Sequence, residues 1–221
     1  MNARDEILGR LRRNARRDGA QEPAARLAAH PRGTVPARSA LDHDGRVALF
    51  MAEAGRVDAT VARLNGTAAI PAAVARYLED AGLAPALRTA PHPLLAGLDW
   101  AGAGLDARPG ASDGHDVAGL NVAIAGVAET GTLVLASGPE TPTTLNFLPD
   151  ADLVVLREAD IVGAYEDVWD RLRAAGEDAG FMPRNINWVT GPSRTADIEQ
   201  TLLLGAHGPR SLHILLVRDD G

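Results

Sequence analysis

The sequence predicts an α/β protein in which a largely parallel sheet is sandwiched by helices, with a helical arm at the N-terminus. The main observation is that helical and strand-like patterns take turns from Val47 to the C-terminus, which is typical of a parallel sheet. A second is the short apolar run "DLVVL", residues 152–156, which is typical of a buried strand. The third is the size and composition of the chain: 221 residues, 46% of them hydrophobic, are enough to form a single domain with a buried core.

The N-terminal arm is predicted from residues 3–17, where Ile7, Leu8 and Leu11 form a narrow apolar stripe among arginines. Two interpretations fit this amphipathic helix: a lid or partner-binding arm, or a solvated helix held by a few leucines. The following residues, 18–45, are rich in Gly, Pro, Ala and Arg and predict a long connection.

We expect the arm and its connection to occupy residues 1–45 and the α/β domain residues 46–221. The segment 91–116 of that domain is dense in Gly, Pro and Asp, which predicts irregular surface with at most a short helical turn. Before it, the pattern predicts a helix, a strand, a second helix opened by proline and a second strand. These fall at residues 47–54, 58–64, 71–83 and 86–90.

The second half of the domain continues the alternation. Residues 118–137 hold two apolar strands joined through the turn "AETGT", a hairpin-like pattern. The "DLVVL" strand is followed by a predicted helix from Asp160 to about Ala174, because apolar residues recur there at helical spacing. The final segment, residues 186–217, predicts a strand, a loop, a helix ended by Gly205, a turn and a last strand. The recurring apolar residues of the Asp160 helix are Ile161, Val162, Tyr165, Val168, Trp169 and Leu172.

Composition excludes several classes of protein. A net charge of -7 and a pI of about 5.3 argue against a nucleic-acid binder. The absence of cysteine excludes disulfides and thiolate-held zinc or iron–sulfur clusters, so we expect no cofactor of the chain's own. No apolar run approaches the ~20 residues needed to span a bilayer, and the N-terminus lacks the apolar core of a secretory signal. We therefore expect a cytoplasmic protein without a membrane span.

The stretch "GVAETGTLVL", residues 126–135, interrupts an apolar region with an acid, two threonines and a second glycine. In one interpretation Glu129 is a turn residue that faces water, while Gly131 supplies a positive φ angle and Thr130 and Thr132 suit strand ends. In the other, a carboxylate at the open edge of an α/β sheet acts as a general base or covalent nucleophile.

The loop "TGPSRTAD", residues 190–197, is the second candidate site. It follows a strand and is predicted to open a helix, with Gly191 in the turn and Ser193 or Thr195 as the N-cap. Unsatisfied amides at such an end bind phosphates and carboxylates, and Arg194 would add a planar fork. A capped turn needs no ligand, however, so both interpretations of this loop remain open.

Three further signals are weaker. His207, in "GAHGP", is predicted to close a helix C-terminus or to form a hydrogen bond across a tight turn. The predicted helix separates it from Ser193, so joint action of the two residues would need a partner subunit or a folded-back connection. The partial dinucleotide pattern at residues 102–107 has no strand before it. The segment "SDGHD", residues 112–116, is more typical of a turn than of metal ligands, so we predict no metal.

Three of these stretches together resemble the lactate-utilisation protein C family, also called the LUD domain. They are "GVAETGTLVL", "PDADLVVLREADIV" and, above all, "TGPSRTADIEQTLLLGAHGPRSLHILLV", so the resemblance is close over about residues 117–217. The family pattern falls on Glu129, Thr130, Gly131 and Thr132, and then on Gly191, Pro192, Ser193, Arg194, Thr195, Asp197, Glu199, His207, Gly208 and Pro209.

The resemblance implies a fold like that of ribose-5-phosphate isomerase, glucosamine-6-phosphate deaminase and CoA transferases. It also implies a role in the oxidation of L-lactate to pyruvate, together with iron–sulfur and cysteine-rich partner proteins. The hypothesis is a non-redox component of that system, with Glu129 as the catalytic candidate and a small anionic ligand at the residues of the two motifs. The alternative is an enzyme of CoA-transferase-like or isomerase-like fold that acts on a small carboxylate or phosphate and uses Glu129 as base or nucleophile.

Overall fold

The computed structural model describes residues 3–14, 25, 28–179, 183–195, 203–205 and 207–218. The chain divides into two compact units, residues 1–34 and 35–221. In the first, helix α1 (Ala3–Asn14) has the predicted amphipathic sequence, and Ile7 and Leu11 on its apolar stripe are about 60% exposed. Residues 15–17, the end of the predicted helix, lie outside the described residues.

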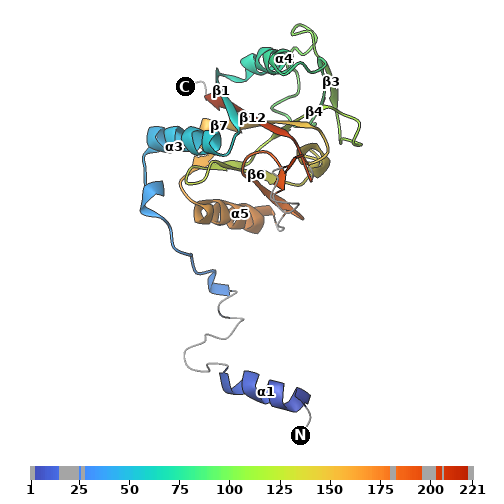
Figure 1. Cartoon of the computed structure of the whole chain (residues 1–221). Helices are drawn as coiled ribbons and strands as arrows, with labels where there is room; N and C mark the ends of the chain where they lie inside the picture. The colour runs from blue at the N-terminus through green and yellow to red at the C-terminus, as the bar shows by residue number, and fades with distance from the viewer. Residues whose placement is uncertain are drawn as a thin grey trace. The chain divides into compact units, whose positions relative to one another are not determined.

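The second unit is built on a six-stranded sheet in which every pairing is parallel (Figure 1). Parallel strands buried on both faces are predicted to have continuous apolar sequences, and the central strands do. The strand order is β1 (Thr60–Asn65), β12 (Ser211–Arg218), β7 (Ala151–Arg157), β4 (Ala118–Val122), β2 (Ala86–Thr89) and β3 (Asp106–Pro109).

A second, four-stranded sheet lies against one face of the first. Its order is β8 (Ile161–Val162), β5 (Ala125–Val127), β6 (Thr132–Ala136) and β9 (Ile186–Val189). Strands β5 and β8 are parallel, whereas β6 is antiparallel to both β5 and β9. The chain passes from the first sheet to the second at residues 123–124, directly between β4 and β5.

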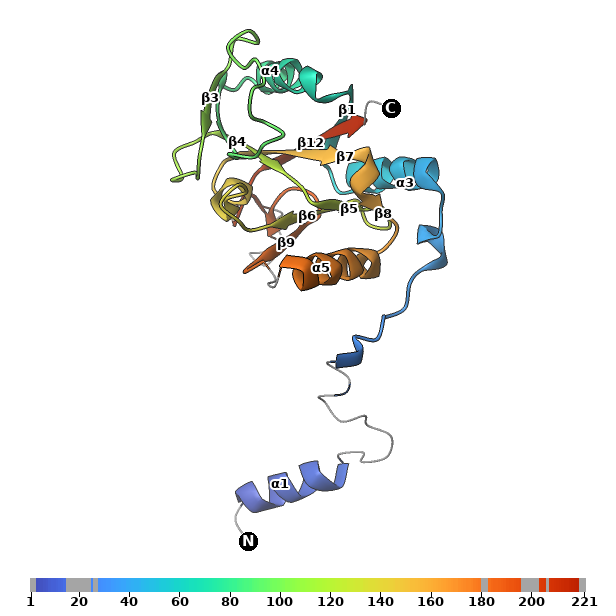
Figure 2. The same ribbon diagram turned by 180° about the vertical axis from the view of Figure 1, so that it is seen from behind.

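Three helices complete the layers. Helix α4 (Ile70–Asp80) covers the outer face of the six-stranded sheet, and α5 (Tyr165–Ala179) covers the outer face of the four-stranded sheet (Figures 1 and 2). Helix α3 (His43–Arg56) packs Val47, Phe50 and Ala54 into the core between the sheets. Its N-cap is Asp42, whose carboxylate accepts a hydrogen bond from the Gly45 N–H at 2.8 Å.

The predicted α/β class with a largely parallel sheet is confirmed, and most elements lie where the sequence placed them. Three predictions were wrong in detail. The segment 91–116 was predicted to be irregular, but it contains edge strand β3 (Asp106–Pro109), which is too short and too close to glycines to show a strand pattern in the sequence. The predicted helix from Asp160 begins at Tyr165, because Ile161 and Val162 form strand β8 beside β5.

The third correction concerns the predicted helix ended by Gly205. Residues Arg194–Thr195 form strand β10, which pairs antiparallel with β11 (Leu203–Leu204). The predicted helix therefore does not continue to Gly205, because Leu203 and Leu204 form a strand. Residues 196–202, including Asp197 and Glu199, lie outside the described residues.

Candidate functional site

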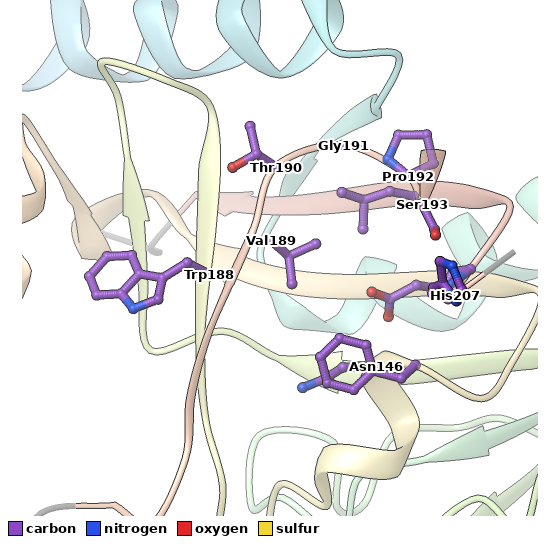
Figure 3. Close-up of a pocket in the computed structure, with 13 residues that line it drawn as sticks. Asn146, Trp188, Val189, Thr190, Gly191, Pro192, Ser193 and His207 are labelled. Atoms are coloured by element: carbon purple, nitrogen blue, oxygen red, sulfur yellow. The ribbon is translucent and has the colours of Figure 1, made fainter. Parts of the chain in front are cut away.

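A cavity of about 200 Å³ opens at one edge of the domain, between the two sheets (Figure 3). It lies at the amino ends of β7 and β12 and at the carboxyl end of β9, and not at the carboxyl edge of the parallel sheet where ligands of open α/β folds usually bind. Its lining comes from four segments. The residues are Asn146, Phe147, Asp152, Trp188, Val189, Thr190, Gly191, Pro192, Ser193, His207, Gly208, Pro209 and Leu212.

The chain brings Ser193 and His207 to the same cavity, although the sequence predicted that a helix would separate them. The Ser193 N–H donates to the Pro209 carbonyl at 2.9 Å, and the Gly205 N–H donates to the Ser193 carbonyl at 3.0 Å. These bonds tie the two ends of the intervening segment together, as the β10–β11 pairing does. The ends of this segment are thus held together by a folded-back connection, one of the two ways in which Ser193 and His207 were expected to be able to meet.

Asp152 lines this cavity and was not among the site residues predicted from the sequence. Its side chain is 1% exposed, and neither carboxylate oxygen has a hydrogen-bond partner among the residues that the structure describes. Burial raises the pKa of Asp152 well above its usual range. Asp152 is the second residue of β7 and lies on the face that carries Val154 and Leu156, so it points between the sheets. The signal that could have identified it is an acid at the start of the apolar run "DLVVL".

The orientation of Asn146 is fixed by a neighbouring amide. Asn121 Oδ1 accepts a hydrogen bond from the Val122 N–H at 2.8 Å, so Asn121 Nδ2 is the end that donates to Asn146 Oδ1, at 2.6 Å. Both asparagines are fully buried. The amide nitrogen of Asn146 is consequently the end that does not take part in this pair, and Asn146 is one of the residues that line the cavity.

Glu129 is a buried residue at the start of α5, and not a carboxylate that faces water. Its side chain is 6% exposed, and its Oε1 accepts a hydrogen bond from the Tyr165 N–H at 3.3 Å. The first N–H groups of a helix have no intrahelical partner and carry partial positive charge, so a carboxylate is stabilised there. Glu129 does not line the cavity described above.

The two threonines beside Glu129 belong to a cluster of four hydroxyl groups. Thr132 Oγ1 lies 2.7 Å from Thr130 Oγ1, 2.9 Å from the Tyr165 hydroxyl and 2.7 Å from Thr190 Oγ1. Thr190 also lines the cavity, so this cluster connects the "ETGT" turn to the cavity wall (Figure 3). The two sequence motifs are therefore neighbours in space, linked by Thr132 and Thr190.

Two glycines hold both motifs against the end of α3. Gly131 has φ +65°, and a Cβ there would collide with the Ala54 backbone nitrogen. Gly191 has φ +74°, and a Cβ there would collide with the Val57 carbonyl oxygen. Positive φ and close approach both require glycine at these positions. Figure 3 shows the Gly191 turn between Thr190 and Pro192.

Arg194 is engaged with the turn that follows α3. Its Nη2 lies 2.7 Å from Asp58 Oδ2 and donates to the Val57 carbonyl at 2.5 Å. Arg194 is not among the residues that line the cavity, and Thr195 lies in strand β10. The anion site at this loop remains a prediction, and residues 196–202, where the predicted helix would begin after a Thr195 cap, lie outside the described residues.

The described residues contain no group of three His, Cys, Asp or Glu side chains placed to hold a metal ion. In the "SDGHD" segment, Asp116 forms an ion pair with Arg88 at 3.2 Å, and Asp113 accepts a hydrogen bond from the His115 N–H. No helix in the described part of the chain is both long and apolar enough to cross a membrane.

Comparison with known proteins identifies the family. The LUD domain matches residues 48–217, which is most of the chain and includes both motifs and the cavity. The chain belongs to the LUD-domain family. A crystal structure of a DUF162-family protein from Deinococcus radiodurans has a similar fold, with a TM-score of 0.58 and 22% identity over 80% of this chain and 99% of that one.

Sequence relatives of this LUD-domain protein align over shorter stretches. An uncharacterized protein of Neisseria meningitidis, NMB1437, is 40% identical over 47% of this chain and 43% of its own length. Lactate utilization protein C of Geobacillus kaustophilus is 32% identical over 48% and 45%, and that of Bacillus subtilis is 34% identical over 42% and 39%. The LUD-domain chain thus spans less than half the length of these curated relatives.

A second cavity of the LUD domain, of about 470 Å³, lies between edge strand β1 and α4. Its arginines are paired: Arg63 forms a bidentate ion pair with buried Glu158, and Arg76 faces Asp80 at 3.7 Å. The hydrogen bond from Arg63 holds the pKa of Glu158 below its usual range. Since its cations already have partners, we consider the first cavity the stronger candidate site.

Proposed function

We propose that this protein is a non-redox component of a bacterial system for L-lactate utilisation, in which L-lactate is oxidised to pyruvate with the help of iron–sulfur and cysteine-rich partner proteins. The observation that carries the proposal is LUD-family membership together with relatives named lactate utilization protein C. A sequence without cysteine cannot supply thiolate ligands to an iron–sulfur cluster, which is consistent with redox centres on partners.

The alternative is an enzyme with Glu129 as base or nucleophile. The Glu129 carboxylate is buried and accepts a hydrogen bond from the Tyr165 N–H, and it does not line the cavity, which gives it a structural role. The alternative therefore has less support than the accessory role. The "ETGT" turn contributes instead to the wall of the cavity through Thr132 and Thr190.

The test is deletion of the gene in its native host, followed by growth on L-lactate as the sole carbon source. We expect growth on L-lactate to fail while growth on pyruvate continues, and the intact gene on a plasmid to restore it. Normal growth of the deletion strain on L-lactate would overturn the proposal.

The partner claim has a separate readout. Affinity purification of the tagged protein from cells grown on L-lactate should recover proteins with the visible absorption of iron–sulfur clusters. The chain purified alone should not reduce an electron acceptor when L-lactate is added, and the recovered complex should. Lactate-dependent reduction of the acceptor by the chain alone would contradict the non-redox role.

A further inference from the structure

The cavity contains an acid that the fold leaves without a partner. Asp152 is 1% exposed and lines the cavity, and both of its oxygens lack hydrogen-bond partners among the described residues. An unpaired buried polar group destabilises a fold, and most such groups in proteins have a partner. A ligand that offers hydrogen bonds to Asp152 would remove this deficit.

The charges around the cavity determine which ligand is complementary. Its described lining includes no lysine and no arginine. The nearest arginines along the chain already face acids: Arg194 pairs with Asp58 at 2.7 Å, and Arg210 faces Asp150 at 3.5 Å. An anionic ligand would lie beside Asp152 with no lysine or arginine in the described lining to pair with it, whereas a cationic ligand could form an ion pair with Asp152. This complementarity is the opposite of the one predicted for the Ser193 loop.

The rest of the cavity lining is suited to a small ligand with an apolar face. Phe147 and Trp188 contribute aromatic rings, and Val189 and Leu212 contribute aliphatic side chains. Figure 3 shows Trp188, Thr190 and Ser193 along one continuous segment, with Asn146 and His207 supplied by two others. Aromatic faces attract organic cations, and hydroxyl and amide groups fix the orientation of a small ligand. A cavity of about 200 Å³ has room for a small molecule, such as a single ring with a short substituent.

We propose that this cavity binds a small organic molecule with a basic nitrogen, and that Asp152 is its counter-ion. Burial raises the pKa of Asp152, and a bound ammonium group would lower it again, so a protonated Asp152 would release its proton to solvent as the cation binds. This proposal does not depend on the proposed role in lactate utilisation. It gives Asp152, the acid in "DLVVL", a role in ligand binding.

Three probes of nearly equal shape test the proposal: benzylamine, benzyl alcohol and benzoate. Titration of the ¹⁵N-labelled protein at pH 7 reports through the indole N–H signal of Trp188, assigned by its loss in Trp188→Phe. We expect benzylamine to shift this signal with a Kd on the order of 1 mM, and benzoate to bind at least tenfold more weakly. Equal or tighter binding of benzoate, or no shift with benzylamine at ~10 mM, would overturn the proposal.

Two matched variants separate the specific acid from general charge. Asp152→Asn keeps the shape but cannot form an anion, and we expect it to weaken benzylamine binding at least tenfold while benzyl alcohol binding changes less than twofold. Asp150→Asn removes the same charge from a side chain that is 66% exposed two residues earlier, and it should leave benzylamine binding within twofold. Circular dichroism establishes that both variants are folded. Unchanged benzylamine binding in folded Asp152→Asn would contradict the role of Asp152.

Discussion

Two buried carboxylates, Glu129 and Asp152, have opposite environments in this fold. Glu129 accepts a hydrogen bond from the Tyr165 N–H in the first turn of α5. Asp152 has no partner among the described residues, and burial raises its pKa. The difference assigns them different tasks: Glu129 holds two elements of the fold together, and Asp152 remains available to a ligand.

Glu129 is expected to contribute to stability through the α5 N-terminus. Glu129→Ala should lower the free energy of unfolding by about 1 kcal/mol, because it leaves the Tyr165 N–H without its acceptor. Glu129→Gln keeps an acceptor oxygen and should cost less than that. Urea denaturation measures both, and Glu140→Ala, at an exposed loop position, should change stability by less than ~0.5 kcal/mol.

The same variants bear on the enzyme alternative. A stable Glu129→Gln protein should restore growth on L-lactate to a deletion strain if the carboxylate has only the structural role. Loss of growth with a normally folded Glu129→Gln protein would instead support chemistry at Glu129.

At the scale of elements, the "ETGT" turn joins three parts of the domain. Gly131 contacts the end of α3, Glu129 the start of α5, and Thr132 the residue that follows β9. Each contact is polar or sterically tight, so the turn is a structural junction and not a solvated loop. This explains why an apolar stretch is interrupted by an acid, two threonines and a glycine.

The stability of this junction is expected to depend on one oxygen atom, the Oγ1 of Thr132. Thr132 is completely buried, and its hydroxyl contacts those of Thr130, Tyr165 and Thr190. Thr132→Val keeps the shape but leaves these partners short of a hydrogen bond, and should lower the free energy of unfolding by about 1–3 kcal/mol.

Thermal or urea unfolding measures this loss. Thr67→Val, at an exposed threonine, is the matched control and should change stability by less than ~0.5 kcal/mol. A Thr132→Val protein as stable as the control would show that the cluster contributes nothing net.

The sequence predicted the elements with strong local patterns and missed those set by distant partners. Helices α3 and α4 and strand β7 have periodic or continuous apolar sequences, which depend on the segment alone. The strand from residue 118 was not expected to leave one sheet and enter another, since β4 and β5 differ only in which strands pair with them. Ile161 and Val162 fitted a helical stripe, but pairing with β5 made them a strand.

The candidate site was predicted in part. Gly191, Ser193 and His207 line one cavity, and ligand binding by them stays a prediction. The chain reversal that brings His207 beside Ser193 depends on the pairing of β10 with β11, which no local sequence pattern predicts. Asp152 was hidden for a related reason: an acid next to an apolar run is usually a strand end in water, and only the second sheet buries it.

At the scale of the whole domain, the second sheet moves the candidate site away from the usual place. It covers the inner face of the six-stranded sheet, and the space that remains between the sheets opens at the amino ends of β7 and β12. On the other face, α4 covers the sheet and buries His213 of β12. The layers therefore place one buried acid, Asp152, and one buried histidine, His213, on opposite faces of the central strands.

His213 is expected to make the fold sensitive to mild acid. Its ring is stacked on Tyr77 with 4.3 Å between the centroids, and its Nδ1 lies 2.7 Å from Thr60 Oγ1. Burial lowers the pKa of His213 from 6.5 to about 4, so the folded protein disfavours the charged ring. The unfolded chain binds the proton first as pH falls, and stability is therefore lost between about pH 6.5 and pH 4.

Replacement of His213 by glutamine isolates this effect, because glutamine does not titrate. We expect His213→Gln to be less stable than the wild type at pH 7, since it loses the ring stack, but to lack this histidine's share of the decline on acidification. The free energy of unfolding of the wild type minus that of His213→Gln should fall by about 3 kcal/mol between pH 7 and pH 4. His115→Gln, at an exposed histidine, is the control and should follow the wild type throughout. Parallel pH profiles for the wild type and His213→Gln would show that the ring accepts a proton in the folded protein without loss of stability, and that burial beneath α4 does not keep it neutral.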